Sequence, residues 1–591
     1  MKPGVALPEN VNMLWSTLAV EACIRNGIVQ FVISPGSRST PLTIAAARNP
    51  AARITRAYDE RGAAFWALGY ARATGKPAVL ISTSGTAVAN YLPAVIEASQ
   101  EGIPLLVFTA DRPPELRDSG ANQTIHQPGI FKGYTRWEFD MPSPSADVAA
   151  AFVLTTVEQA IFRTRSPEPG PVHLNWMFRE PLAPVKPESL PPALLTFWKD
   201  WSAQAAPFTE YRAAHLVPDR DVIRQIKKRL LAARNGLLVV GGLRNAAERA
   251  AALRLAMHLA WPVYADVRSG LAVHHLPHGF RYLDLVLADE PWRQSYQPDV
   301  ILHLGMPVTS KRYLQWVAAQ PALEYIHIAP LPRRLDPNHQ VRLRIWAGIP
   351  ETIQALTYTM LPVSHPPVIN QLPLLHKTVA RTITEALQEK GDYNEIGVIA
   401  TLSANLPENV AVFLGNSLPI RLWDWFSEDH ATLRPIYANR GASGIDGLIA
   451  TACGVAAGEE KTVVAIIGDI SALHDLNSFL HVKESAFPVI LVILNNSGGG
   501  IFRWLPVAEV KDSFETYFVT PHTLHFRDAA RMFQIPYHAP RTISGFKQTL
   551  KKALATNRST IIEIRTQSQK TWDVYQHIIK HIRHAIQSIS N

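Results

Sequence analysis

Two uninterrupted apolar runs in the last third of the chain constrain its fold more than any other feature. They span residues 462–467 and 488–494, and both are short, rich in β-branched residues and free of charge. Such runs are typical of strands buried on both faces of a parallel sheet. The segment between them, residues 473–484, has the length and mixed polarity of a crossover helix. The sequence therefore predicts two neighbouring parallel strands joined by a helix.

Polar residues follow both predicted strands. Asp469 follows the first strand, and Asn496 follows the second. Because the carboxyl ends of parallel strands meet at one edge of a sheet, where ligands bind, we expect these side chains to lie close together. Their hard oxygens suit Mg2+ or Ca2+, and N–H groups of a helix starting after Asp469 suit a phosphate. A Gly-Asp pair after a strand is, by itself, more often a turn with a helix N-cap. The two together predict a clamp for a metal and a diphosphate.

Bulk composition describes a multidomain globular protein. A chain of 591 residues is too long for one core, and its 47% apolar and 18% charged residues are ordinary for such proteins. Cys23 and Cys453 both stand in apolar segments, which favours buried reduced thiols. We find no apolar run of the roughly 20 residues that cross a bilayer and no export signal at the start. The expectation is a cytoplasmic protein without membrane contact.

The net charge of +9 raises the alternative of a non-catalytic protein that binds nucleotides or nucleic acid. The basic residues are spread along the chain, with only short groups such as residues 224–229 and 580–583. A solvated surface or small anionic substrates explain this distribution better, so we expect no nucleic-acid partner.

Apolar strand-like runs alternate with helix-length segments along the whole chain, which predicts α/β domains with parallel sheets. Pro-containing passages at residues 180–207 and 361–373 divide this alternation into three parts and predict extended linkers. The predicted strands are 29–34, 54–58, 78–82, 105–110 and 172–175 in the first part, 237–240, 262–265, 300–304 and 325–328 in the second, and 411–414, 436–437, 463–467, 489–494 and 560–564 in the third.

The interval of 27 residues from Asp469 to Asn496 resembles the cofactor signature of the thiamine-diphosphate decarboxylase and synthase superfamily. The resemblance implies thiamine diphosphate, held through Mg2+ or Mn2+ by Asp469, Asn496 and a backbone oxygen, that of Gly498. It also implies three doubly wound domains with mainly parallel sheets: a pyrimidine-binding domain (1–185), a linker (186–220), a middle domain (221–360), a second linker (361–375) and a diphosphate-binding domain (376–591).

Glu60 follows the strand predicted at residues 54–58, where a helix begins. An acidic residue there is most often matched to the helix dipole. Residues 84–86 and 170–175, however, resemble landmarks of the superfamily's pyrimidine-binding domain. By that resemblance Glu60 is the catalytic carboxylate that hydrogen-bonds the aminopyrimidine ring and activates the cofactor.

Further motifs resemble one family within the superfamily, the 2-succinyl-5-enolpyruvyl-6-hydroxy-3-cyclohexene-1-carboxylate synthases of menaquinone biosynthesis. They are residues 34–42, 110–116, 120–123, 310–312, 415–417 with Arg421, 439–447 and 468–477. The resemblance implies a transferase that decarboxylates 2-oxoglutarate and adds the resulting succinyl carbanion to isochorismate in a conjugate, Stetter-like reaction. It also implies a homodimer or homotetramer, because members of the superfamily build the site between two subunits.

The matched motifs supply the expected ligand contacts. Six of the matched residues are basic, and Arg offers a planar fork for the carboxylates of the two dicarboxylic substrates. The expected substrate contacts are Ser37, Arg38, Arg112, Asn122, Gln123, Lys311, Arg312, Ser417, Arg421, Arg440, Ile501 and Phe502. The expected cofactor contacts are Glu60, Ser417, Ile445, Gly468, Asp469, Ile470, Ser471, Asn496, Gly498 and Ile501, with Ile445 as an apolar wedge beneath the cofactor.

Two positions depart from the family pattern: Gly500, where a side-chain amide is frequent, and His126, where Arg is frequent. The nearest alternative is another thiamine-diphosphate keto-acid synthase or decarboxylase, such as an acetohydroxyacid synthase. Its small substrates would not require so many cations.

Overall fold

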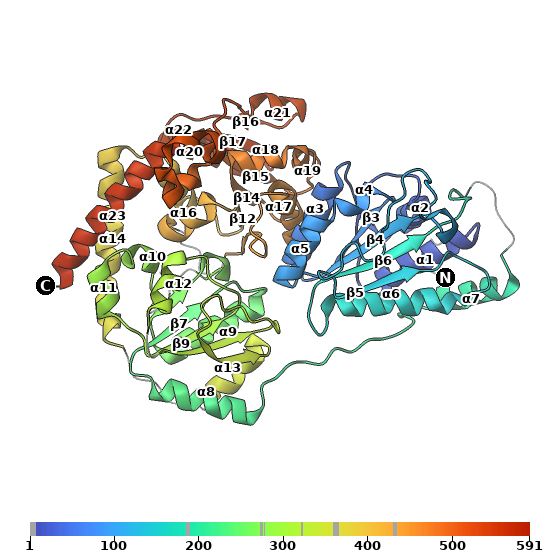
Figure 1. Ribbon diagram of the computed structural model, residues 1–591, viewed down its shortest axis with the longest axis horizontal. Helices are drawn as coiled ribbons and strands as arrows, with labels where there is room; N and C mark the ends of the chain where they lie inside the picture. The colour runs from blue at the N-terminus through green and yellow to red at the C-terminus, as the bar shows by residue number, and fades with distance from the viewer. Residues whose placement is uncertain are drawn as a thin grey trace. The chain divides into compact units, whose positions relative to one another are not determined.

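The computed structural model describes residues 8–184, 190–271, 276, 278–320, 323–358, 366–428 and 434–590. Residues 185–189 and 361–365, which fall in or beside the two predicted linkers, lie outside this set. The chain divides into two compact units. Unit 1 comprises residues 1–214, 439–460 and 474–486, and unit 2 comprises residues 215–438, 461–473 and 487–591. Three parallel sheets are present in the described residues, one in unit 1 and two in unit 2, which confirms the predicted α/β fold class (Figure 1).

The sheet of unit 1 has the strand order β2-β1-β3-β4-β6-β5. Its strands are β1 (Gln30–Ile33), β2 (Arg53–Arg56), β3 (Ala78–Ser82), β4 (Leu105–Asp111), β5 (Trp137–Met141) and β6 (Pro171–Met177). An apolar core joins the sheet to α1 (Val11–Arg25), α2 (Thr40–Arg48) and α6 (Ala150–Arg165). Two further helices, α3 (Glu60–Thr74) and α5 (Leu92–Glu101), pack on the strands as well, so the sheet is doubly wound.

Unit 1 also contains α17 (Leu448–Glu459) and α19 (Phe479–Glu484). Helices α17 and α3 cross closely, because a Cβ atom added at Gly69 would lie 2.1 Å from the Thr451 carbonyl oxygen. A Cβ atom at Gly454 would lie 2.0 Å from the Trp66 carbonyl oxygen. Only glycine permits this backbone approach.

The first sheet of unit 2 has the order β11-β10-β9-β7-β8. Its strands are β7 (Gly236–Val240), β8 (Val263–Ala265), β9 (Val300–Leu304), β10 (Glu324–Ala329) and β11 (Val341–Trp346). One apolar core joins the sheet to α8 (Arg220–Ala232), α9 (Ala246–Leu259) and α13 (Ile349–Thr357). A second core, containing α10 (Leu283–Val286), α11 (Glu290–Ser295) and α12 (Lys311–Ala318), continues into the last sheet. This shared core explains why the two sheets form one unit.

The last sheet has the order β13-β12-β14-β15-β17-β16 and carries the predicted clamp. Its strands are β12 (Ala411–Leu414), β13 (Ile436–Tyr437), β14 (Val463–Gly468), β15 (Val489–Asn495), β16 (Tyr537–His538) and β17 (Thr560–Arg565). The helices of this region within unit 2 include α14 (Leu372–Lys390), α15 (Glu395–Ala404), α16 (Leu418–Phe426), α22 (Ile543–Ala555) and α23 (Ser568–Ser590). Strands β14 and β15 pair in parallel, as predicted, with Gly468 opposite Leu494.

The crossover from β14 to β15 differs from the predicted single helix. It consists of α18 (Asp469–His474), a short 3-10 turn (Leu476–Ser478) and α19. Asp475 interrupts the helix because its carboxylate is committed to other donors. Its Oδ2 accepts from the backbone N–H groups of Ile449 and Ala450 at 2.8 and 3.1 Å, and its Oδ1 accepts from the Ser478 hydroxyl at 2.8 Å.

The first predicted linker also differs, since residues 192–202 form the helix α7 (Pro192–Ser202) rather than an extended segment. Leu194, Trp198 and Trp201 recur at helical spacing and are buried in the core of unit 1. The second predicted linker ends in a 3-10 turn (Pro367–Gln371) and the start of α14. None of the helices in the described residues has the length and apolarity needed to cross a membrane.

Candidate active site

The ends of β14 and β15 bring Asp469 and Asn496 to one edge of the last sheet, as the sequence predicted. Asp469 is 2% exposed, and its Oδ2 accepts the Gly498 N–H at 2.9 Å. His522 Nε2 lies 3.2 Å from the same oxygen. Asp469 therefore ties the strand end to the loop that carries Asn496 and Gly498.

Asn496 has a partner that sequence reasoning missed. Its Nδ2 donates to Glu395 Oε1 at 2.6 Å, from the start of α15. This bond fixes the amide so that Asn496 Oδ1 faces away from Glu395, and Oδ1 is buried with no hydrogen-bond partner. Glu395 Oε2 is likewise buried without one. In the sequence, Asn394-Glu395 is indistinguishable from an ordinary helix start, so no signal marked Glu395 as part of the site.

The charges around this edge fit a divalent cation. Burial and the nearby charge of Asp469 raise the pKa of Glu395 to about 7. Burial also raises the pKa of Asp469. Two buried carboxylates with raised pKa values, beside an unpartnered amide oxygen, are a hard-oxygen donor set that a cation of the Mg2+ class would stabilise.

Glu395 holds the Asn496 amide in place, so its loss should weaken the metal site. We expect Glu395→Ala to weaken Mg2+ binding about 10- to 100-fold, the usual effect of losing a group that orients a metal ligand. Titration calorimetry with Mg2+ and thiamine diphosphate measures it. Thr566→Val is the matched control, because Thr566 donates to the same Glu395 oxygen at 3.3 Å without touching Asn496. Equal affinity in Glu395→Ala and the control would remove Glu395 from the site.

The predicted diphosphate contacts lie next to the clamp. The Ile470 N–H, one of the expected phosphate donors, donates to Asp469 Oδ1 at 2.8 Å. Gly468 faces open space, since an added Cβ atom would meet no heavy atom within 4 Å. Ser471 is 4% exposed. The Gly498 carbonyl, the expected third metal ligand, accepts the Gly500 N–H at 2.9 Å. A Cβ atom at Gly500 would lie 2.7 Å from Asn496 Nδ2, so glycine here leaves room for the Asn496 amide.

Backbone strain marks two loops of unit 2 that hold predicted contacts. Ser417 has a φ of +71°, and Ser497, between Asn496 and Gly498, has a φ of +64°. A positive φ at residues other than glycine costs about 1–3 kcal/mol and concentrates at functional sites. The Ser417 carbonyl accepts a hydrogen bond from Arg421 Nη1 at 2.6 Å, so these two predicted contact residues touch each other.

Two further predicted contacts are apolar. Ile501 packs against the core of unit 2. The Phe502 ring contacts Phe518 with ring centroids 5.7 Å apart.

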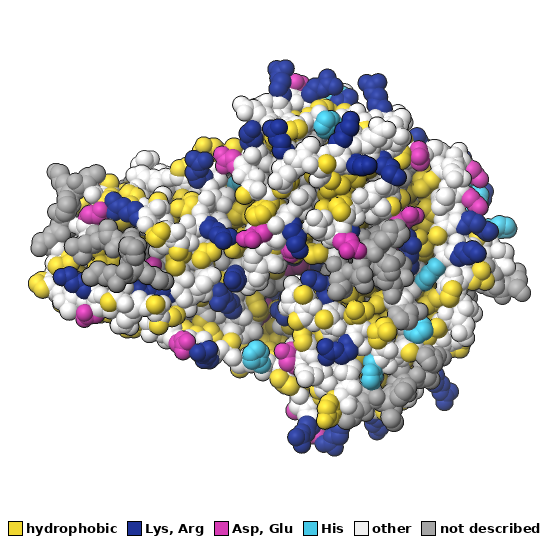
Figure 2. Space-filling view, turned by 180° about the vertical axis from the view of Figure 1, so that it is seen from behind, with side chains coloured by type: hydrophobic (Ala, Val, Ile, Leu, Met, Phe, Trp, Pro, Cys, Tyr) yellow, Lys and Arg dark blue, Asp and Glu magenta, His cyan; other side chains and the backbone are white. Residues whose placement is uncertain are grey.

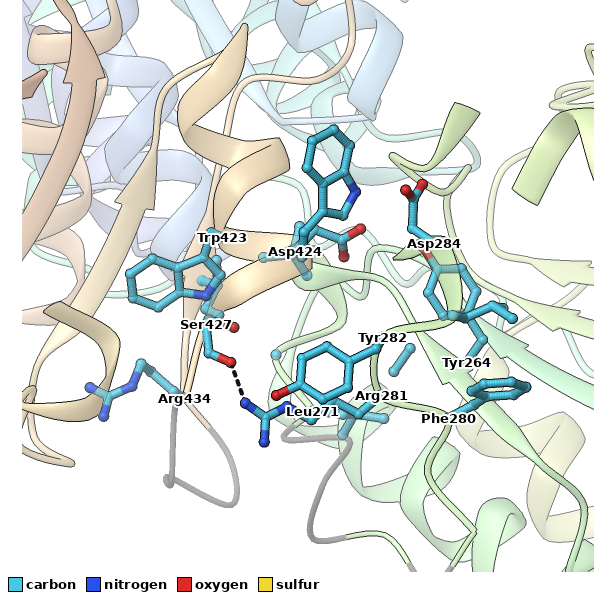
Figure 3. A pocket seen from close by; sticks show the side chains of 16 residues that line it. Tyr264, Leu271, Phe280, Arg281, Tyr282, Asp284, Trp423, Asp424, Ser427 and Arg434 are labelled. Carbon is cyan, nitrogen blue, oxygen red and sulfur yellow. Dashed lines mark hydrogen bonds between the residues drawn. The ribbon is translucent and has the colours of Figure 1, made fainter. Parts of the chain in front are cut away.

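Lys311 and Arg312 begin α12 in the middle of the chain. Lys311 is exposed, and Arg312 Nη1 donates to Asp284 Oδ1 at 2.6 Å. Asp284 also lines a pocket between the β8 and α10 segments and α16 (Figure 3). The pocket is lined by Tyr264, Ala265, Val267, Gly270, Leu271, Phe280, Arg281, Tyr282, Leu283, Asp284, Trp423, Asp424, Trp425, Ser427, Arg434 and Ile436. None of the predicted site residues is among them.

The lining of this pocket holds two carboxylic side chains, Asp284 and Asp424, and two guanidinium groups, Arg281 and Arg434. Burial and the charges of Asp266 and Asp284 raise the pKa of Asp424 well above its ordinary value. Arg281 Nη2 donates to the Ser427 carbonyl at 2.9 Å, the dashed line in Figure 3. The side chains of Asp284 and Asp424, and an Arg281 guanidinium already bonded to backbone, make the pocket a poor site for a dicarboxylate.

In unit 1, Glu60 is the first residue of α3. Asp59 caps this helix, since its Oδ1 accepts the N–H groups of Arg61 and Gly62 at 3.0 and 3.4 Å. Glu60 itself is partly exposed. Asp59 therefore accepts the free N–H groups at the start of α3, and the Glu60 carboxylate is not needed as a cap.

Several predicted substrate contacts of unit 1 gather around Ser84. Arg112 Nη1 donates to the Ser84 hydroxyl at 3.0 Å and Nη2 to the Asn122 carbonyl at 2.9 Å. Gln123, whose φ is +55°, donates from Nε2 to the Ser84 carbonyl at 3.1 Å. The structure thus brings Arg112, Asn122 and Gln123 together. His126 and Ser37 are exposed.

Arg38 lies in the same part of unit 1 but is tied to other groups. Its Nη1 donates to the Phe178 carbonyl at 2.9 Å, and its Nη2 lies 3.3 Å from Glu180. Burial and the charge of Arg112 lower the pKa of Arg38. The two guanidinium groups therefore repel each other, which an anionic ligand would relieve.

The loop that carries Arg440 and Ile445 is held by a second residue missed from the sequence, Glu97. Its carboxylate accepts the N–H groups of Gly441 and Ala442 at 2.8 and 2.7 Å and pairs with Arg72 at 3.3 Å. Arg440 and Ile445 are both partly exposed. The structure fixes the backbone of this loop within unit 1.

Comparisons with known proteins identify the domains of the chain. Residues 13–130 match the family described as thiamine pyrophosphate enzyme, N-terminal TPP binding domain. Residues 194–414 match the middle domain of thiamine pyrophosphate enzymes, and residues 430–564 match their C-terminal TPP binding domain. The chain therefore has the three domains of thiamine-pyrophosphate enzymes. The precise boundaries given from the sequence stay a prediction.

Benzoylformate decarboxylase from Polynucleobacter necessarius has the same fold, with a TM-score of 0.70 over 94% of this chain and 98% of its own, at 16% identity. Relatives of much higher identity are 2-succinyl-5-enolpyruvyl-6-hydroxy-3-cyclohexene-1-carboxylate synthases. The protein of Rubrobacter xylanophilus is 43% identical over 96% of this chain and 98% of its own length. That of Salinibacter ruber is 39% identical over 98% of both. The chain belongs to the family of 2-succinyl-5-enolpyruvyl-6-hydroxy-3-cyclohexene-1-carboxylate synthases, within the thiamine-pyrophosphate-dependent enzymes.

Proposed function

We propose that the chain decarboxylates 2-oxoglutarate and adds the succinyl unit to isochorismate, as a transferase of menaquinone biosynthesis. The observation that carries this proposal is the buried donor set of Asp469, Asn496 and Glu395 in a chain related over nearly its full length to synthases of that name. Thiamine diphosphate supplies, when bound, the electron sink for decarboxylation.

The residues of the chain hold and orient the reacting groups. Asp469 and Asn496, with the Gly498 carbonyl, are the proposed ligands of Mg2+ or Mn2+, and Glu395 orients the Asn496 amide. Ser417, Ile445, Gly468, Ile470, Ser471 and Ile501 are proposed to contact the cofactor. Glu60 is proposed to exchange a hydrogen bond with the cofactor's pyrimidine ring.

The substrates are proposed to bind through their carboxylates. Arg112 supports this assignment, because Ser84 and the Asn122 carbonyl hold its guanidinium plane in place. Arg38, Arg421, Arg440, Lys311 and Arg312 are proposed as the other cations, with Ser37, Asn122, Gln123, Ser417, Ile501 and Phe502 beside them. We propose a homodimer or homotetramer in the cytoplasm, from the family resemblance.

A nucleic-acid partner has little support. On the face that Figure 2 shows, Lys and Arg side chains are scattered among acidic and apolar ones rather than gathered into a stripe. Phosphate-backbone binding depends on clustered cations, so the net charge of +9 does not indicate it.

A donor and acceptor assay tests the function. Purified protein with thiamine diphosphate and Mg2+ should consume 2-oxoglutarate and isochorismate in equal amounts and release carbon dioxide. Product formation is followed by mass spectrometry. Pyruvate in place of 2-oxoglutarate is the comparison that separates this function from an acetohydroxyacid synthase. Turnover with pyruvate and none with 2-oxoglutarate would overturn the proposal.

A further inference from the structure

Within the part of the chain that the structure describes, one group of side chains has metal-ligand character and plays no part in the site above. Glu389 lies in the last turn of the long helix α14, and His577 and His581 lie on α23. One potential ligand atom from each residue lies within 4.8 Å of the other two. We propose that these three residues bind a divalent transition metal, of the Zn2+, Co2+ or Ni2+ class, between α14 and α23.

The two histidines are spaced to act together. Residues i and i+4 lie on the same face of a helix, and the ring centroids of His577 and His581 are 4.1 Å apart. A pair of imidazoles at this spacing recurs in helical metal sites. Glu389 adds a carboxylate from the neighbouring helix, so the three ligands come from two elements.

Hydrogen bonds define the donor atoms. His581 Nδ1 lies 2.8 Å from the His577 carbonyl oxygen. Because a carbonyl only accepts, Nδ1 carries the proton, and the lone pair of the neutral ring is on Nε2. Donation from one ring nitrogen to a backbone carbonyl is the arrangement that orients metal-bound histidines.

Glu389 contacts the first histidine directly, since His577 Nε2 and Glu389 Oε2 lie 2.9 Å apart. A carboxylate also only accepts, so a proton bridges these atoms. When a metal ion binds in place of that proton, the neutral His577 ring carries its one N–H proton on Nδ1 and offers the lone pair of Nε2 to the metal. Two imidazoles and one carboxylate leave a fourth position for water, which matches an open tetrahedral Zn2+ site.

The ligand atoms of this site favour different metals from those of the clamp at Asp469 and Asn496. Imidazole nitrogen favours Zn2+, Co2+, Ni2+ and Cu2+, whereas the all-oxygen set around Asp469 favours Mg2+. The histidine site is on the surface, with the His577 side chain 18% and the Glu389 side chain 61% exposed. A cation can therefore reach it without local unfolding.

The supporting helices are packed, which fixes the backbone on which the ligands stand. Ile383 and Ala386 of α14 and Ile578 and Ile582 of α23 are buried in the core of unit 2. Sites built on rigid helices hold their ligands in place before the metal arrives. A metal bound here links the end of α14 to α23 and stabilises the folded chain in proportion to its occupancy.

The experiment uses the full chain with thiamine diphosphate and excess Mg2+, so that the clamp is filled. Zn2+ is titrated against a chromophoric chelator, and Co2+ is added separately to record its visible absorption. We expect one Zn2+ per chain with a dissociation constant of about 10 μM or lower, a tetrahedral Co2+ spectrum, and a Zn2+-dependent rise in the thermal midpoint.

His581→Ala and Glu389→Ala should each weaken Zn2+ binding at least about tenfold and abolish the thermal shift. His584→Ala is the matched control, an exposed histidine of the same helix that is not in the cluster. Unchanged turnover in all three variants shows that they fold. Equal Zn2+ affinity in His581→Ala and His584→Ala, or binding weaker than about 1 mM in the unsubstituted chain, would overturn the proposal.

Discussion

Glu60→Gln should lose about 10²- to 10⁴-fold in turnover while retaining thiamine diphosphate binding. Glutamine keeps the size of the side chain but cannot share a proton with the pyrimidine ring nitrogen in the way a carboxyl group can. The fold should be unaffected, because Asp59 rather than Glu60 accepts the free N–H groups at the start of α3. Steady-state turnover and cofactor affinity, measured on the same preparation, test both halves of the prediction.

Two further measurements separate activation from a structural effect. Exchange of the thiazolium C2 proton into deuterium oxide, followed by proton NMR on the bound cofactor, should slow in Glu60→Gln. Glu101→Gln provides the control, since Glu101 is a buried carboxylate of the same unit that pairs with Arg72 at 2.7 Å. This control should lower the unfolding temperature and leave exchange unchanged. Normal exchange and turnover in Glu60→Gln would refute the role of Glu60.

The central strands could be predicted from the sequence because their environment is uniform. Strands β9 and β12, buried on both faces, have the predicted bounds 300–304 and 411–414. The sequence analysis missed β5, β11 and β16, and each of these stands at the edge of its sheet. Edge strands are partly solvated and carry charge, as Val341–Trp346 does with two arginines, so they lack the continuous apolar run.

The candidate site could be predicted only where it depends on local order along the chain. Asp469 and Asn496 were predictable because parallel pairing of two recognisable strands places both at one sheet edge. Glu395 was not, since it meets Asn496 across 101 residues and its own surroundings look like a helix start. Long-range hydrogen bonds of this kind leave no periodic signal.

The predicted substrate cations are not all available to a substrate. Arg38 lies beside Glu180, and Arg312 lies beside Asp284. Arg112 instead contacts a hydroxyl and a carbonyl, so its charge is not cancelled by those partners. The sequence shows the cations but not which carboxylates neutralise them, because ion pairs are formed by the tertiary fold.

Asp469→Ala should abolish Mg2+-dependent cofactor binding, with a loss of affinity of at least about 100-fold, beyond that expected for a group that only orients a ligand. The substitution removes the proposed charged ligand. It also removes the acceptor of the Gly498 and Ile470 N–H groups, so the loop holding Asn496 loses its tie to β14. Titration calorimetry of thiamine diphosphate at fixed Mg2+ measures the affinity.

A second variant separates the effect of the Asp469 charge from the effect of its hydrogen bonds to the Gly498 and Ile470 N–H groups. Asp469→Asn keeps an oxygen that can accept one of these N–H groups but carries no charge. Its cofactor affinity should fall nearly as far as that of Asp469→Ala. Its unfolding temperature should stay closer to that of the unsubstituted chain. Asp512→Ala, an exposed aspartate of the same unit, should change neither quantity. If Asp469→Asn bound the cofactor as tightly as Asp512→Ala, the carboxylate would have only a structural role. We therefore expect the proposed cation binding to depend on the charge at position 469 more than on the geometry of its loop.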